Sequence, residues 1–189
     1  MNLHGKRVLF LGSSITYGYA SGGVSFADIM AERCGLFCLK EAVSGTTLAD
    51  VEEKSYVARL KKISADTKVD LFVCQLSSND SAKGVAPAET EAGIRFIVEY
   101  VRRVFGCPVV FYTSPRYKKE QYGELVRDLL RLAEEYGFYV IDLWNDPEMS
   151  AVSEEDRKRY MKDSVHPTLE GYRDWWTPRF ISFCEALPE

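Results

Sequence analysis

Five short apolar runs recur along the chain, and each gives way to glycine or small polar residues. They cover residues 8–11, 36–43, 69–76, 108–113 and 138–143. Continuous runs of Val, Leu and Phe are typical of strands in a sheet that is covered on both faces. We therefore predict five strands, with the polar residues at their carboxyl ends, where such sheets bind ligands.

Apolar residues recur at helical spacing between most of these runs. The spacing predicts helices over residues 25–35, 48–64, 87–105 and 118–136. In the second of these we expect Leu48, Val51, Leu60 and Ile63 to face inward, and Thr47 with Asp50 to form a capping box. Residues 17–24 and 81–87 are predicted to be loops.

The end of the chain breaks this regular alternation. Residues 144–167 form a long connection, for which we predict one or two turns of helix capped by Ser153. Connections of this length inside a compact domain are commonly functional. We expect Thr168 to cap a last helix that places Leu169, Tyr172, Trp176, Phe180 and Phe183 inward.

Alternating strands and helices predict an α/β fold. Right-handed crossovers between the strands give a mostly parallel sheet with helices on both sides, which is a three-layer α/β/α sandwich. A chain of 189 residues has the length of one domain, so we expect residues 1–189 to fold as a single unit.

Charge and composition narrow the classes of partner. The chain has 28 acidic and 24 basic residues and no basic cluster, which argues against nucleic acid and favours a small or neutral substrate. No run of 18 apolar residues and no apolar signal core occurs, so we expect a protein without membrane insertion that is cytoplasmic, or secreted if a signal has been trimmed from the sequence. The five scattered cysteines include no CxxC pair and are expected to be free thiols.

A serine at the end of the first strand is the starting point for the chemistry. Ser14 needs a base to become a nucleophile, and the sequence contains two histidines. His4 precedes the first strand and so lies on the wrong side of the sheet. His166 follows Asp163 by three residues, and Pro167 keeps this pair out of a helix. These residues fit the roles of nucleophile, base and orienting carboxylate.

Three further groups fit the role of oxyanion donors. The N–H of Ser14, the N–H of Gly45 and the side-chain amide of Asn79 follow the first, second and third strands, so we expect them at one edge of the sheet. One such donor is typically worth about 2.7 to 4 kcal/mol of barrier.

Four segments at strand ends and near the end of the chain form a recognisable set. They are Gly12-Ser13-Ser14-Ile15-Thr16, Ser44-Gly45-Thr46-Thr47, Ser77-Ser78-Asn79-Asp80 and Asp163-Ser164-Val165-His166-Pro167. Together they resemble, in order and spacing, the SGNH hydrolase superfamily, also called GDSL esterases and lipases. The resemblance implies a flavodoxin-like sandwich and hydrolysis of carboxylic esters through an acyl-serine intermediate, with neither a metal nor another cofactor. It also implies a Ser14, Asp163 and His166 triad, with Ser14, Gly45 and Asn79 forming the oxyanion hole.

Two positions depart from the family pattern. The aspartate that usually precedes the nucleophile is Ser13, and the glycine two places before the asparagine is Ser77. Neither change removes a catalytic group, so we expect them to affect how the first loop is braced and which substrate is chosen.

The sequence leaves several functions to compare. We expect an esterase for short acyl groups, including acetyl groups on a carbohydrate, and the same chemistry would serve a thioesterase or lysophospholipase. The hydroxyls after the first strand also resemble the phosphate loop of flavodoxins, but a flavin- or phosphate-binding module gives no role to Asp163 and His166. A degenerate enzyme used only for binding is a third alternative.

Overall fold

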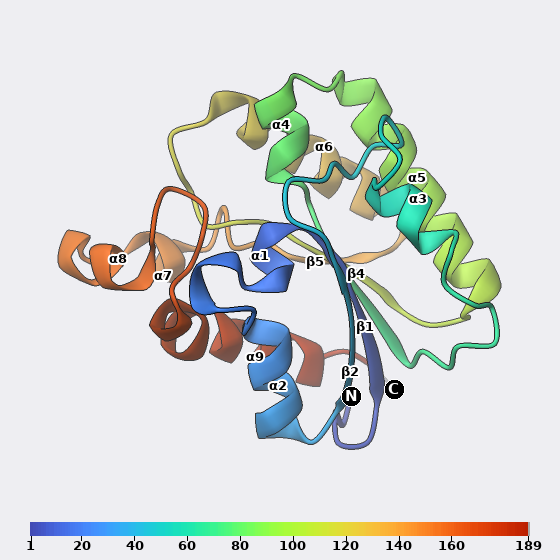
Figure 1. Cartoon of the computed structure of the whole chain (residues 1–189), viewed down its shortest axis with the longest axis horizontal. Coiled ribbons are helices and arrows are strands. Elements are labelled where there is room, and N and C mark those ends of the chain that lie inside the picture. The colour runs from blue at the N-terminus through green and yellow to red at the C-terminus, as the bar shows by residue number, and fades with distance from the viewer. Residues whose placement is uncertain (189) are drawn as a thin grey trace.

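The computed structural model describes residues 1–188 and contains one five-stranded parallel sheet (Figure 1). The strand order is β2-β1-β3-β4-β5, which is the flavodoxin order. All four neighbouring pairs are parallel, and Leu9 of β1 lies between Leu39 of β2 and Phe72 of β3. The five strands are β1 (Arg7–Gly12), β2 (Phe37–Ala42), β3 (Leu71–Gln75), β4 (Val109–Tyr112) and β5 (Tyr139–Ile141).

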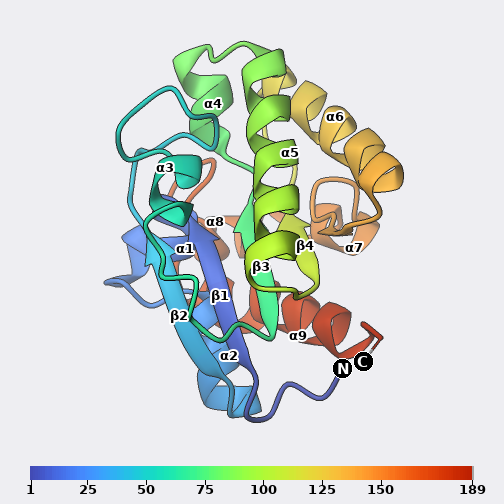
Figure 2. The same cartoon turned by 90° about the vertical axis from the view of Figure 1, so that its right-hand side faces the viewer.

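Helices cover both faces of the sheet and confirm the predicted three-layer α/β/α architecture (Figure 2). Along β1, Val8 and Phe10 pack against α2 (Phe26–Cys34) and α9 (Thr177–Glu185) on one face, whereas Leu9 and Leu11 point to the other face. The second face is covered by α3 (Tyr56–Leu60), α5 (Pro87–Val104) and α6 (Glu120–Tyr136). The central strands β1, β3 and β4 are therefore buried on both sides, as their continuous apolar sequences indicate, whereas the edge strands β2 and β5 are partly exposed.

Short helices begin directly after two of the central strands, where loops were predicted. After β1 come α1 (Ser14–Tyr17) and the 3₁₀ turn η1 (Tyr19–Ser21), and after β3 comes α4 (Ser78–Lys83). The predictions of loops over 17–24 and 81–87 were therefore wrong in part. In α4 the Ser77 hydroxyl accepts the N–H of Asn79 and Gly84 ends the helix in a left-handed conformation, so local capping is enough for a short helix.

The predicted helix over 48–64 was mostly wrong, because the structure is helical only in α3. The carboxylate of Asp80 accepts the backbone N–H groups of Leu48 at 2.7 Å and Ala49 at 3.0 Å. These amides are thereby held in a loop by a residue 31 to 32 positions away in the chain, and helical spacing alone does not reveal this competition.

The capping groups and exposure of this segment also differ from the prediction. Thr47 does not cap a helix, because its N–H donates to the carboxylate of Glu52. Ser55 is the cap of α3, where its hydroxyl accepts the N–H of Ala58. Val51, expected to face inward, is exposed.

The C-terminal part of the chain follows the prediction with two corrections. Ser153 caps α8 (Glu154–Tyr160), which comes after the short α7 (Pro147–Ser150), and the hydroxyl of Thr168 accepts the N–H of Gly171. The last helix, however, is π-helical over η2 (Gly171–Trp176) before it continues as α9, and Leu169 is exposed rather than buried.

Two further features are the state of the cysteines and the character of the helices. The five cysteines are free thiols, of which Cys74, Cys107 and Cys184 are buried and the other two are half-buried. Within residues 1–188, no helix combines the length and the apolar character needed to cross a bilayer.

Candidate active site

The structure brings the three predicted triad side chains into one hydrogen-bonded chain. His166 Nε2 lies 2.8 Å from Ser14 Oγ, and His166 Nδ1 lies 2.7 Å from Asp163 Oδ2. Ser14 is 7% exposed, so its hydroxyl is close to the surface but sheltered. His4 is in contact with Gly35, far from this group, as expected for a residue before β1. The arrangement can move a proton from the serine to an imidazole whose other nitrogen faces a carboxylate.

A tight loop fixes Asp163 and His166 relative to one another. An isolated antiparallel bridge joins Met161 to Pro167, and the N–H of Lys162 donates to the carbonyl of His166 at 2.8 Å. Within the loop, Asp163 Oδ1 accepts the N–H groups of Val165 and His166 at 2.9 and 2.8 Å. The carboxylate is thus oriented by its own backbone, with Oδ2 left for the imidazole.

The pKa of Asp163 is lowered from its ordinary value. Partial burial acts in the opposite direction, but it is outweighed by hydrogen bonds from the His166 ring and from the N–H groups of Val165 and His166. Hydrogen bonds to the charged form favour ionisation. The carboxylate therefore stays charged through the neutral range, as an orienting partner of the imidazole must.

The segment that carries His166 docks on the segment that carries Ser14. Figure 1 shows the chain after α8 passing beside α1 and η1. Just beyond His166, the hydroxyl of Tyr172 donates to the carbonyl of Ile15 at 2.6 Å. Tyr172 is fully buried, so this bond joins the residue after the serine to the C-terminal helix inside the core.

Two of the three predicted oxyanion donors have free backbone N–H groups. Ser14 begins α1, and the first N–H groups of a helix have no intrahelical acceptor. Gly45 is exposed with φ +79°, and no group within residues 1–188 accepts its N–H. The left-handed conformation is one that glycine adopts without strain.

The side-chain amide of Asn79, the third predicted donor, already donates hydrogen bonds within the protein. Its Nδ2 donates to the carbonyl of Thr46 at 2.9 Å and to Ser13 Oγ at 3.2 Å. Asn79 thereby links the ends of β1, β2 and β3 in one network. An oxyanion would have to replace the longer of these bonds, the one to Ser13.

Gln75 braces the turn that presents Ser14 and was missed in the sequence. Its Oε1 accepts the N–H of Ser13 at 3.0 Å, the Ser13 hydroxyl at 3.3 Å and the Thr16 hydroxyl at 3.0 Å. A Cβ on Gly12 would lie 1.8 Å from Thr16 Oγ1, so the turn closes only around glycine. The available signal was a glutamine at the end of the otherwise apolar β3.

Arg59 is a second brace, placed beneath the ends of β1 and β2. It is 7% exposed, and Nη2 donates to the carbonyl of Gly12 at 2.7 Å and to Thr46 Oγ1 at 3.2 Å. Nη1 donates to the carbonyl and the carboxylate of Glu41, each at 3.0 Å, and Nε donates to the carbonyl of Lys54. One guanidinium therefore fixes the turn that carries Ser14 relative to the loop that carries Gly45.

Asp80 holds the other side of the same loop. It is fully buried, and besides the two amides of residues 48 and 49 it accepts the Thr90 hydroxyl at 3.0 Å. Asp80 follows Asn79 directly in α4. This short helix therefore fixes the position of the asparagine relative to the loop that carries Gly45. The sequence showed Asp80 only as part of a polar strand end.

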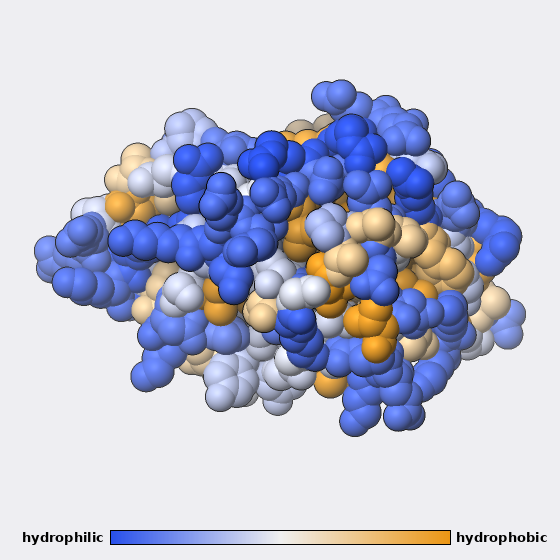
Figure 3. Space-filling model, turned by 90° about the horizontal axis from the view of Figure 1, so that it is seen from above, coloured by the Kyte–Doolittle hydropathy of each residue, from blue (hydrophilic) through white to orange (hydrophobic). Residues whose placement is uncertain are grey.

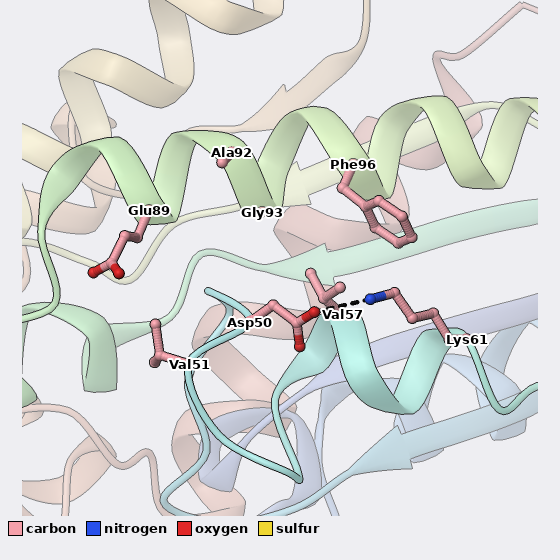
Figure 4. Close-up of a pocket in the computed structure, with 8 residues that line it drawn as sticks. All are labelled: Asp50, Val51, Val57, Lys61, Glu89, Ala92, Gly93 and Phe96. Atoms are coloured by element: carbon pink, nitrogen blue, oxygen red, sulfur yellow. Dashed lines mark hydrogen bonds and ion pairs between the residues drawn. The ribbon is translucent and has the colours of Figure 1, made fainter.

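A cavity on another part of the molecule is separate from Ser14, His166 and Asp163. A space of about 260 Å³ lies between the loop before α3 and α5, where Val51, Val57 and Phe96 are opposed and Asp50 pairs with Lys61 at 2.8 Å (Figure 4). Seen from above, apolar surface gathers on the half of the molecule that carries α5, while the opposite end with α8 is mostly hydrophilic (Figure 3). The triad residues do not line this cavity.

No metal centre accompanies the site in the part of the chain that the structure describes. Across residues 1–188, no three His, Cys, Asp or Glu side chains converge in a way that could hold a metal ion.

Comparison with known proteins identifies relatives at the level of family and fold. A model of the GDSL-like lipase/acylhydrolase family matches residues 10–173. A search of curated proteins found no match.

Several solved structures have the same fold. An acetylxylan esterase from Geobacillus stearothermophilus superposes with a TM-score of 0.75 at 17% identity, over 96% of this chain and 95% of that one. A member of the lipolytic protein G-D-S-L family from Veillonella parvula gives 0.77 at 15% identity, over 96% and 99%. A GDSL-like lipase from Bacteroides thetaiotaomicron gives 0.73 at 19%, over 95% and 88%. At these identities the likeness establishes a shared fold.

Proposed function

Because the chain belongs to the GDSL-like lipase/acylhydrolase family, we propose that it is a serine esterase that hydrolyses small carboxylic esters through an acyl-serine intermediate. The observation that carries this proposal is the continuous relay from Ser14 Oγ through His166 to Asp163, at 2.8 and 2.7 Å. A nucleophile, a base within hydrogen-bond reach and a third group that orients the base are the parts needed for acyl transfer.

In the first half of the reaction, Ser14 Oγ attacks the carbonyl carbon of the ester while His166 Nε2 takes its proton. Asp163 holds the imidazole and stabilises the imidazolium that forms. The carbonyl oxygen becomes an oxyanion, to which the N–H groups of Ser14 and Gly45 can donate, with Asn79 as a further donor once it releases Ser13. Collapse of this intermediate breaks the bond to the alcohol oxygen, which receives the proton from His166.

In the second half, water hydrolyses the acyl-serine. The oxygen of the water attacks the acyl carbon while His166 takes a proton from the water. The N–H groups of Ser14 and Gly45, with Asn79, donate to the second oxyanion as they did to the first. When the bond to Ser14 Oγ breaks, His166 returns the proton to the serine and the carboxylic acid leaves. The chain supplies every proton-transfer group that this cycle requires.

The described part of the chain favours a small acyl group. Within residues 1–188, the sheet and the helices that cover it leave little chain for a lid or a deep acyl tunnel. The fold shared with an acetylxylan esterase is in keeping with acetyl groups on a carbohydrate as substrate. We expect acetate esters to be turned over faster than esters of long fatty acids.

The test is the turnover of p-nitrophenyl acetate by the wild-type chain and by Ser14→Ala. We expect a burst of p-nitrophenol in the wild type and a loss of turnover by several orders of magnitude in the variant. A fluorophosphonate probe should add one phosphonyl group to Ser14, seen by intact mass and peptide mapping. Ser182→Ala, which removes an exposed hydroxyl on α9, is the matched control. Unchanged turnover in Ser14→Ala would overturn the proposal.

A further inference from the structure

An exposed tyrosine lies against the imidazole of the triad. The ring centroids of Tyr19 and His166 are 5.3 Å apart with an interplanar angle of 52°. Tyr19 is 63% exposed, the highest exposure among the large hydrophobic side chains that reach the surface. Most of this ring therefore faces solvent directly beside the group that handles the proton.

The loop that carries Tyr19 is built to hold it in place. Gly18 and Gly22 flank the turn with φ of +88° and +68°. A Cβ on Gly18 would lie 2.5 Å from the carbonyl oxygen of Val24, so the two arms of the loop meet too closely for any other residue. The N–H of Gly23 closes the loop by donating to the carbonyl of Gly18 at 2.9 Å.

Lys40 of β2 also stabilises the loop that carries Tyr19. Lys40 Nζ donates to the carbonyl of Gly23 at 2.8 Å and to that of Tyr17 at 3.3 Å, and it is paired with Asp28. The hydroxyl of Ser21 donates to the carbonyls of Gly18 and Val24. The backbone of the Tyr19 turn is thus fixed without help from a ligand, which lowers the entropy that binding would cost.

The direction of proton transfer indicates which part of an ester would contact the ring of Tyr19. In the proposed reaction, His166 Nε2 returns its proton to the oxygen of the leaving alcohol, so that oxygen has to lie next to the imidazole. Tyr19 lies next to the same imidazole. The oxyanion donors Ser14 N–H and Gly45 N–H come from the ends of β1 and β2 and face the carbonyl instead.

We propose that Tyr19 is a specificity-determining residue that contacts the alcohol portion of the ester and favours alcohols that carry a ring. This inference rests on the proposed esterase function. A tyrosine ring offers a broad apolar face with little side-chain freedom to lose, and it packs well against another flat face. The C–H face of a pyranose and the face of an aryl group share this chemistry, and the two are separated by the choice of substrates.

The experiment compares three acetate esters in the wild type and in Tyr19→Ala: methyl acetate, phenyl acetate and an O-acetylated methyl xyloside. We expect kcat/KM for the ring-bearing esters to fall roughly tenfold in Tyr19→Ala, with a change of less than about twofold for methyl acetate. A larger loss with the xyloside than with phenyl acetate identifies a sugar ring as the natural partner, and the reverse identifies an aryl ring.

Two further measurements separate this role from a general effect on the site. All three esters form the same acetyl-serine, so its hydrolysis rate, measured after the burst, should be unchanged in Tyr19→Ala. Tyr19→Phe keeps the ring and should keep the preference. Tyr17→Ala is the matched control, because Tyr17 is also exposed on this segment but its ring lies by Lys40. It should leave the ratio between ring-bearing esters and methyl acetate as in the wild type.

The possible failures differ from one another. An equal loss with all three esters would show that Tyr19 only supports the fold of the site, and an unchanged ratio would show that it does not contact the alcohol. Either result overturns this inference while leaving the esterase proposal in place. Absence of turnover with every ester in the wild type would overturn the proposed function and this inference with it.

Discussion

The guanidinium of Arg59 donates a 2.7 Å hydrogen bond to the carbonyl of Gly12, two residues before Ser14. The same group reaches Thr46, the residue after Gly45. The position of Ser14 relative to Gly45, a predicted oxyanion donor, is therefore fixed by a buried side chain that does not contact the imidazole.

Replacing Arg59 tests this positioning role. In Arg59→Met the carbonyls of Gly12, Glu41 and Lys54 lose a charged donor inside the protein. We expect the free energy of unfolding to fall by about 3 kcal/mol. In the folded fraction, kcat should fall while KM changes little, because the donors shift relative to the serine.

Urea unfolding measures the first effect, and steady-state kinetics at a temperature well below unfolding measures the second. Arg95→Met is the matched control, since Arg95 forms a partly exposed pair with Glu91 on α5. Such pairs contribute about 0 to 1 kcal/mol, so this variant should resemble the wild type. If Arg59→Met were destabilised with an unchanged kcat, Arg59 would serve the fold alone.

Asp163→Asn is expected to lower kcat by on the order of 10³ to 10⁴ while the chain remains folded. The amide that replaces the carboxylate no longer holds the same tautomer of His166 or stabilises its charged form. Stopped-flow acylation by p-nitrophenyl acetate measures the loss. A variant with near-wild-type acylation would show that the 2.7 Å contact between these side chains is not used in the reaction.

The lowered pKa of Asp163 also predicts how stability depends on pH. A carboxyl whose pKa is lower in the folded protein than in the unfolded chain contributes its full stabilisation above the unfolded value of about 3.9. That contribution is lost as the pH falls through the lower folded pKa. The stability difference between wild type and Asp163→Asn should be constant from pH 5 to 7 and should shrink below about pH 4. A difference that grows on acidification would contradict the direction of the shift.

Asn79→Ala tests the one predicted oxyanion donor that is engaged in the structure. If its amide turns to the oxyanion during the reaction, kcat should fall by about 10² to 10³ with little change in KM. Ser13→Ala removes the weaker acceptor of that amide and the 3.3 Å bond from the Ser13 hydroxyl to Gln75, but it leaves the bond from Asn79 to Thr46, so its effect should be much smaller. Equal losses in the two variants would mean that Asn79 acts by bracing Ser13 and not by binding the oxyanion.

Gly12→Ala should be among the most damaging single-methyl additions in the chain. The new Cβ would overlap Thr16 Oγ1 and would lie 2.8 Å from Gln75 Oε1, within the brace of the nucleophile turn. Overpacking of this kind costs about 1 to 3 kcal/mol, and here it also displaces Ser14. Thermal unfolding and fluorophosphonate labelling measure the two effects.

Gly84→Ala is the comparison for that variant. Gly84 has φ +69° and open space around its Cβ position, so only backbone strain of about 1 to 2 kcal/mol is added, at the end of α4. Labelling of Ser14 should be normal in Gly84→Ala and slow in Gly12→Ala. Normal labelling in both would show that the turn can relax around the added methyl group.

The sequence predicts well those parts of the fold that depend on local periodicity. The five strands, α2, α5 and α6 and the cap at Thr168 were confirmed, because each combines an apolar stripe with a nearby start or stop signal. Ser14 and His166 lie 2.8 Å apart, as expected, because Ser14 follows the carboxyl end of β1 and the long connection after β5 carries His166 to the same edge. The expectation of an inward Leu169 failed because the helix is π-helical from Gly171, which shifts the face that a 3.6-residue repeat predicts.

The rest of the site depends on contacts between residues far apart in the chain. Asp80 prevents a helix at residue 48, and Arg59 joins the ends of β1 and β2 to the loop that follows β2. In the sequence, Asp80 is an ordinary charged residue at a polar strand end, and Arg59 is an ordinary charged residue within a predicted helix. Only the burial of both side chains among backbone groups distinguishes them, and burial of that kind follows from the folded arrangement.

The separation of 152 positions between Ser14 and His166 has a consequence for how the protein becomes active. Contacts between such distant residues form only after a large loss of chain entropy, and therefore late in folding. In the proposed mechanism, the Ser14 hydroxyl has no base until the loop from Met161 to Pro167 docks against α1. Esterase activity in a refolding experiment would accordingly report completion of the whole domain, and partly folded chains would not consume ester.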